Sequence, residues 1–357
     1  MNSNTHKPDL GQAGRFAQTL IVLASLVIVV AGLKAAAAIM VPLLMAIFLA
    51  IIASAPLRWL QDRGLPLWAS ISVVFIVLVL TLMVIGSLIG ASVNQITTAL
   101  PRYEQQLTDM VDQAVNWLGN LGIQIPAGGV IDLINPGAAA QFFGRLVSGF
   151  GGLLANSMLI IFTVLFIMVE TSTLPAKLFS ILKQPEETLA SLDRFMQGVA
   201  RYLVIKAVMS FITGTLIAIY LLLLGVDFAF LWGALAFFMN FVPYIGSILA
   251  AVPAVVLALL DADLTTATAV AGGFLATNML VGNVLEPKFT GRGLGQSTLV
   301  VFLSLIFWGW VFGPVGMLLS TPLTMLMMIA LENDPRTRWI SILLSDQAPA
   351  DSKTAHN

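Results

Sequence analysis

Long apolar runs alternate with short polar loops along most of the chain. A helix needs about 20 apolar residues to cross a bilayer, and six runs meet this requirement, at 16–33, 35–55, 67–93, 149–169, 204–224 and 264–285. A cleaved signal peptide has a short apolar core before a soluble body, whereas the first run is followed almost at once by another, so we interpret it as a retained span. The pattern predicts an all-α, polytopic integral membrane protein.

Two further apolar tracts, 229–260 and 297–331, are too long for one straight span. At about 1.5 Å per residue the first would form a helix of about 48 Å, against a hydrocarbon core of about 30 Å. Proline and glycine, which interrupt helices, lie in the middle of both. We therefore predict two re-entrant or broken helical hairpins. The polar or helix-breaking residues of the two tracts are Asn240, Pro243, Tyr244 and Gly246, and Gly313, Pro314, Gly316, Ser320 and Thr321.

The positions of the 17 Lys and Arg residues favour the hairpins over full crossings. Lys and Arg accumulate in cytoplasmic loops. With both termini in the cytoplasm and both tracts folded back, fourteen of the 17 are cytoplasmic. If both tracts crossed fully, Lys288 and Arg292 would move outside, leaving twelve of the 17.

The remaining segments divide the chain further. We expect polar cytoplasmic tails at 1–14 and 347–357, around a membrane transporter domain at 15–346. Within that domain, 94–148 is an extracytoplasmic amphipathic segment and 170–203 is a cytoplasmic helical segment. Apolar residues repeat at spacings of three and four in both. Such a seam either packs on its own subunit or forms a subunit interface.

Composition argues against an enzyme. The chain is 58% hydrophobic and 10% charged, has no cysteine, and has histidine only at His6 and His356 in the polar tails. Thiolate and imidazole chemistry is therefore missing from its body. There is no phosphate loop for ATP and no HExxH, GxSxG or GxGxxG motif. With a net charge of -1 and no long basic patch, we expect no nucleic acid, ATP, cofactor or metal to bind.

Polar residues inside apolar runs are the candidates for a solute pathway, since they are costly in a bilayer. Besides the two tracts, they are Asn278 and Asn283 on the span before Glu286 and Pro287. The asparagines alternatively bond neighbouring helices. Glu286 alternatively pairs with Lys288 or Arg292, and Lys206 is expected to snorkel to the cytoplasmic face. Glu286 and Asp227 are the possible coupling carboxylates, although Asp227 is also suited to capping a helix start.

Several stretches resemble the autoinducer-2 exporter family of bacterial permeases. They are Arg201-Tyr-Leu-Val-Ile-Lys206, Trp232-Gly-Ala-Leu-Ala-Phe237 with Pro243-Tyr-Ile-Gly246, Leu285-Glu-Pro-Lys288 with Gly291-Arg-Gly-Leu-Gly295, and Leu305-Ile-Phe-Trp-Gly-Trp310 with Gly313-Pro-Val-Gly-Met-Leu-Leu-Ser-Thr-Pro322. The resemblance covers about residues 15 to 346. It implies a multi-pass transporter of the bacterial inner membrane that forms a homo-oligomer, with five subunits as the suggested number.

Three functions remain open, and the resemblance bears on the first two. The first is export of a small polar solute, autoinducer-2 in quorum sensing or a related metabolite. The second is sodium(lithium)/proton antiport, which other members of the family suggest and which would couple transport to protons or sodium. The third is a non-transporting membrane scaffold. Autoinducer-2 is small, polyhydroxylated and near neutral, so neutral donors such as Asn240, Tyr244, Asn278 and Asn283 suit it best.

Overall fold

The computed structural model describes residues 10–120, 156–171, 177, 185–243, 245–290, 296–332 and 337–346. In these ranges the regular structure is helical, apart from one isolated bridge between Gln296 and Ser345. The all-α prediction is confirmed. The helices are α1 (Leu10–Ala35), α2 (Ala37–Asp62), α3 (Leu67–Asn120), α6 (Ser157–Glu170), α8 (Pro185–Leu223), α9 (Ala229–Met239), α10 (Gly246–Asp261), α11 (Leu264–Asn278), the π-helix η1 (Met279–Leu285), α12 (Glu286–Thr290), α13 (Thr298–Leu318), α14 (Ser320–Glu332) and α15 (Arg338–Leu344).

Among the described residues, five helical stretches are long and apolar enough to cross a membrane: 37–62, 67–92, 197–223, 264–289 and 298–318. The first four overlap the spans predicted at 35–55, 67–93, 204–224 and 264–285, and the fifth lies in the second long tract. At the other two predicted spans, 16–33 and 149–169, the stretches 20–35 and 157–170 count as shorter apolar helices. A polytopic membrane protein is therefore confirmed.

Two helices extend further than the apolar pattern indicates. The α3 helix continues past the end of its span to Asn120, and α8 begins at Pro185, well before its span. The sequence becomes polar at these points, but a change of polarity does not interrupt the backbone hydrogen bonds of a helix. The span and the adjoining amphipathic segment are consequently one helix in each case.

Both long tracts break where proline and glycine predict. In the first, α9 ends at Met239 and α10 begins at Gly246. In the second, Gly313 has φ 66° and ψ -149°, which interrupts α13. The 11 residues of α9 span about 16 Å, far less than a hydrocarbon core of about 30 Å. That each tract enters and leaves the bilayer on one side stays a prediction.

The two breaks share an unusual close approach. A Cβ atom added to Gly246 would lie 1.8 Å from the Met239 carbonyl oxygen, and one added to Gly316 would lie 1.9 Å from that of Trp308. In both cases the start of the second arm presses on the backbone of the first arm. Only glycine fits such a contact, which is why both reversals contain one.

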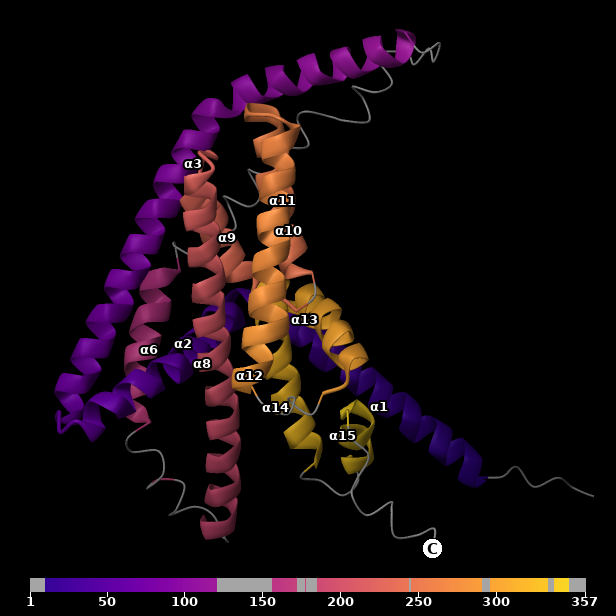
Figure 1. Cartoon of the computed structure of the whole chain (residues 1–357). Coiled ribbons are helices and arrows are strands. Elements are labelled where there is room, and N and C mark those ends of the chain that lie inside the picture. Colours follow the sequence, from indigo (N-terminus) through magenta and orange to yellow (C-terminus); the bar gives the residue numbers. More distant parts are fainter. Residues whose placement is uncertain are drawn as a thin grey trace, which may run out of the picture.

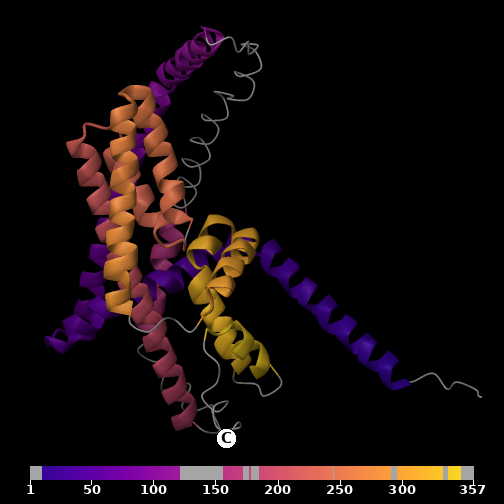
Figure 2. The ribbon, with the colours of Figure 1, turned by 45° about the vertical axis from the view of Figure 1, so that its right-hand side comes forward.

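The two hairpins meet near the middle of the molecule. The hairpin of α9 and α10 descends from the end that carries the α10–α11 loop, while α13 and α14 approach from the end that carries α12 and α15 (Figures 1 and 2). Phe241 from the first break shares one hydrophobic core with Val315 and Leu319 from the second. Phe48 of α2 packs edge-on against Phe241, with ring centroids 5.6 Å apart.

Small residues bring α8 and α9 into close contact. A Cβ atom on Gly214 would lie 2.7 Å from the Gly233 carbonyl oxygen, and the reverse distance is also 2.7 Å. Membrane helices commonly use glycine to approach this closely. The contact holds the first hairpin against the length of α8, the helix on which the candidate site is built.

Candidate functional site

One face of α8 carries a line of buried polar side chains. Tyr202, Lys206 and Ser210 are 8%, 8% and 0% exposed. Residues four apart lie on one face of a helix, so the three side chains occupy consecutive turns. We call these three residues the α8 polar face. Each of them meets a different element of the surrounding structure.

Lys206 forms an ion pair with Glu286 at the start of α12. Its Nζ atom lies 2.7 Å from Glu286 Oε1 and 2.9 Å from Oε2. Their side chains are only 10% and 22% exposed. The prediction that Lys206 snorkels to the surface is wrong, because a carboxylate neutralises it inside the protein. Sequence reasoning named Lys288 or Arg292 as partners of Glu286; the structure shows Lys206 as a partner, and Arg292 lies outside the described residues.

The first break reaches the α8 polar face through Asn240. This residue ends α9 and donates a hydrogen bond from Nδ2 to Ser210 Oγ, 3.0 Å away. Gly246 is buried, Pro243 is partly buried, and Tyr244 lies outside the described residues. The Asn240 side chain thus makes a polar contact between this hairpin and α8.

The second break reaches the α8 polar face through Thr321. Thr321 and Ser320 are buried at the start of α14, and the Tyr202 side chain approaches Thr321. Gln296, just before α13, donates a hydrogen bond from Nε2 to the Thr321 carbonyl oxygen at 3.3 Å. Ser320 Oγ donates to the Met317 carbonyl oxygen. Of the other predicted residues here, Gly313, Pro314 and Gly316 build the reversal.

The remaining candidate residues lie in or beside a π-helix. The segment Met279–Leu285 is wound more widely than an α-helix, a feature that often marks functional sites. Asn278 before it is partly buried, whereas Asn283 within it and Pro287 after it are exposed. The structure therefore brings Glu286 to the α8 polar face and leaves Asn283 and Pro287 at the surface.

Asp227 lies at a different place. It follows the C-terminal end of α8, about 26 Å along that helix from Lys206 at about 1.5 Å per residue. The cap interpretation is wrong, because Phe228 occupies the N-cap position of α9. The Asp227 carboxylate instead accepts a hydrogen bond from the Tyr103 hydroxyl at 3.2 Å.

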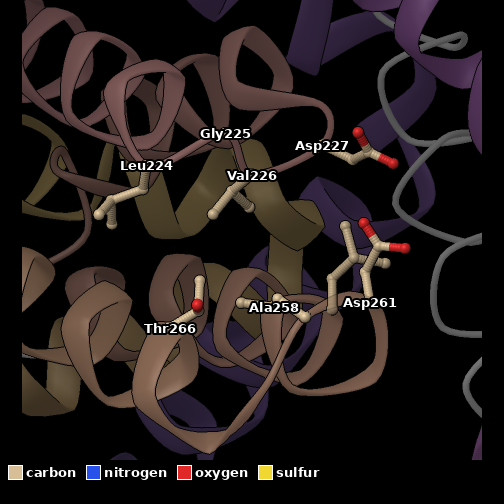
Figure 3. A pocket seen from close by; sticks show the side chains of 9 residues that line it. Leu224, Gly225, Val226, Asp227, Ala258, Asp261 and Thr266 are labelled. Carbon is tan, nitrogen blue, oxygen red and sulfur yellow. The ribbon is translucent and has the colours of Figure 1, made fainter.

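A small pocket of about 50 Å³ opens beside Asp227. Figure 3 shows the carboxylates of Asp227 and Asp261 on the same side of it, with Thr266 on the facing helix. Arg102 pairs with Asp261 at 2.6 Å. Burial and the negative charges of Asp227 and Asp261 raise the pKa of Tyr103. Arg102 and Tyr103 therefore link the extension of α3 to both ends of the first hairpin: to Asp227 before α9 and to Asp261 at the end of α10.

No group of three or more His, Cys, Asp or Glu in the described ranges could hold a metal ion. Tyr202, Ser210 and Gln296 were missed as site residues by sequence reasoning. The signal for the first two was present: polar residues recur every four positions at Tyr202, Lys206 and Ser210 within an apolar run. Gln296 had no such periodic signal, because it lies in a loop.

Apolar helices of spanning length, two interrupted tracts and polar contacts buried between them are the features of a multi-pass membrane transporter. Comparison with known proteins agrees. Residues 23–336 match the AI-2E family transporter family, and the chain belongs to it.

Several relatives extend over nearly the whole chain. The chain is 38% identical to the AI-2 transport protein TqsA of Escherichia coli (strain K12), over 92% of this chain and 95% of the relative. It is also 38% identical to a Haemophilus influenzae protein whose name proposes transport without a substrate, over 92% and 96%. YhhT of Escherichia coli (strain K12), whose name likewise proposes transport, is 36% identical over 92% and 95%.

Proposed function

We propose that this protein exports autoinducer-2, or a closely related small polar metabolite, across the bacterial inner membrane, with both termini in the cytoplasm. The observation that carries the proposal is the α8 polar face. It brings together residues of both interrupted tracts and Glu286, at consecutive turns of one helix. Paired interrupted helices are where many secondary transporters bind their substrates.

The chemistry of these contacts suits a near-neutral hydroxylated solute. The charges of Lys206 and Glu286 compensate each other, and the other groups are an amide and hydroxyls. Such groups both donate and accept hydrogen bonds, as the hydroxyls of autoinducer-2 require. The name of the TqsA relative, an AI-2 transport protein, supports the same solute.

An export assay tests the proposal. Cells that lack the protein are complemented with wild type, Asn240→Ala, Asn278→Ala or Asn283→Ala at equal expression, and extracellular autoinducer-2 is measured. We expect a several-fold loss of export for Asn240→Ala and Asn278→Ala, because each removes an amide group that could bond a hydroxylated solute. The exposed Asn283 serves as the matched control. Wild-type export by both test variants would remove these asparagines from the pathway.

A second candidate is sodium(lithium)/proton antiport. It is favoured by one observation, the carboxylate of Glu286 held in a mostly buried site next to α8. Everted vesicles given sodium or lithium would then show a proton flux that Glu286→Gln abolishes and Asp227→Asn leaves intact. A flux that survives Glu286→Gln would exclude this carboxylate as the coupling group.

We further propose that the protein works as a homo-oligomer, with five subunits as the number that the family resemblance suggests. The apolar side chains of α1 from Leu20 to Val29 are largely exposed, so this helix has apolar surface for lipid and for a second copy. Native mass spectrometry of the detergent-solubilised protein gives the subunit number directly, and a monomer would contradict the proposal.

A further inference from the structure

Two buried polar side chains meet where Gln296, just before α13, contacts Thr321 at the start of α14. Gln296 is 9% exposed and Thr321 is 3% exposed. Gln296 Oε1 makes no hydrogen bond with any described residue, whereas Thr321 Oγ1 has no hydrogen bond of normal geometry but interacts with the Tyr202 side chain. A buried polar atom that is left unpaired destabilises the folded protein. The Gln296 amide oxygen, next to Thr321 with its incompletely bonded hydroxyl group, indicates a place where a ligand supplies the missing partner.

The surroundings restrict what that partner is. The Gln296 amide nitrogen is already engaged, since it donates to the Thr321 carbonyl oxygen. This bond holds the Gln296 side chain at the start of α14, where its Oε1 makes no hydrogen bond with a described residue. Tyr202, which approaches Thr321 from α8, adds a second hydroxyl. The three side chains offer acceptors and donors together, which is the requirement for binding hydroxyl groups.

The nearby charges argue against an ionic ligand. Lys206, one turn along α8 from Tyr202, is paired with Glu286, so its ammonium group and the carboxylate compensate each other. A free anion or cation would have to compete with this pair. A neutral hydroxyl group has no such competition.

We propose that Gln296, Thr321 and Tyr202 form a subsite that binds hydroxyl groups of the transported solute between the start of α14 and α8. The proposal rests on the proposed function and deepens it, because it assigns the recognition of polyhydroxylated solutes to these residues. Bound hydroxyls would satisfy Gln296 Oε1 and Thr321 Oγ1 and link α14 to α8 through the solute. Selectivity for hydroxylated over deoxygenated compounds follows from these unpaired groups.

Transport in proteoliposomes tests the subsite. Wild type, Thr321→Val, which keeps the shape and removes the hydroxyl, and Gln296→Met are compared for KM with autoinducer-2 and with an analogue that lacks one hydroxyl. We expect both substitutions to raise the KM for autoinducer-2 by about two- to tenfold, the value of one or two neutral hydrogen bonds. We also expect Thr321→Val to lose the preference of wild type for the hydroxylated compound. A purely structural role would lower the maximal rate for both solutes alike.

The control is Ser70→Ala, which removes another buried and unpaired hydroxyl on α3, and should leave KM unchanged. Equal KM values and equal preferences in wild type and both variants would overturn the subsite while the proposed function stands. If wild type carries no autoinducer-2, the proposed function is overturned instead. The subsite is then judged by thermal stabilisation of the purified protein with ribose: stabilisation that Thr321→Val abolishes supports it, and identical curves overturn it.

Discussion

At the scale of single residues, the ion pair between Lys206 and Glu286 dominates the energetics of the site. Breaking a buried pair by removing one partner leaves an uncompensated charge and costs about 3–5 kcal/mol. Replacing both partners by neutral groups is much less harmful. The pair therefore makes each of its members dependent on the other.

We accordingly expect Lys206→Met and Glu286→Gln each to lower the thermal stability of the purified protein strongly. The double variant should recover most of the loss, because no unpaired charge remains. Differential scanning fluorimetry measures the effect, with Lys288→Met, at an exposed position of α12, as the control. A double variant as unstable as the sum of the two single variants would show that the pair is not coupled.

A second residue-scale prediction concerns the start of α11. Asp263 caps this helix by accepting a hydrogen bond from the Thr266 backbone N–H at 2.6 Å, and this bond lowers the pKa of its carboxyl group. A lowered pKa means that the cap is fully effective above the ordinary aspartate pKa and is lost as the pH falls through the folded value. Asp263→Ala should therefore destabilise the protein near neutral pH and reduce its sensitivity to acid. Thermal melts between pH 3 and pH 7 check this, and parallel curves for variant and wild type would contradict it.

Sequence reasoning found some of these residues and misplaced others. Asn240 was identified because a polar side chain beside a helix break is costly in a bilayer, and it does bond to α8. Lys206 was misjudged, because its distance from Glu286 along the chain hides their contact in space. Contacts between residues 80 positions apart depend on how helices pack, which no local pattern encodes.

At the scale of elements, the two glycines at the reversals decide whether the hairpins close. Gly246→Ala places a Cβ atom 1.8 Å from the Met239 carbonyl oxygen, a contact that only a backbone movement relieves. We expect a loss of stability of about 3 kcal/mol or more and a loss of transport. Gly272→Ala on α11, where an added Cβ meets nothing within 4 Å, is the matched control and should be neutral or stabilising. Wild-type melting of Gly246→Ala would show that the arms are not held this closely.

The elements themselves were predictable to different degrees. Proline and glycine act locally, so the breaks near Gly246 and Gly313 follow from the sequence. The π-helix from Met279 to Leu285 did not, since its residues fit an ordinary α-helix equally well. The continuity of α3 to Asn120 was also missed, because the amphipathic pattern marks where the surroundings change and not where the helix ends.

At the scale of the whole molecule, the structure and the charge distribution lead to one test of topology. The loop between α10 and α11 lies at one end of the molecule, while α12 and α15 lie at the other (Figure 1). The chain has no cysteine, so single cysteines can be introduced without background. Ala262→Cys should react with an impermeant maleimide from the periplasm, whereas Asp62→Cys and Asp346→Cys should react only from the cytoplasm. Labelling of all three from one side would contradict the two opposed hairpins.

The arrangement of the three contacts along α8 also limits how this helix can change in evolution. An α-helix turns by about 100° per residue, so one amino acid inserted between Tyr202 and Ser210 would rotate every later position away from its partner. Substitutions at the exposed positions of the same stretch leave the register intact. Relatives that preserve the three contacts should therefore vary freely in the lipid-facing residues of α8 while keeping its length between these positions unchanged.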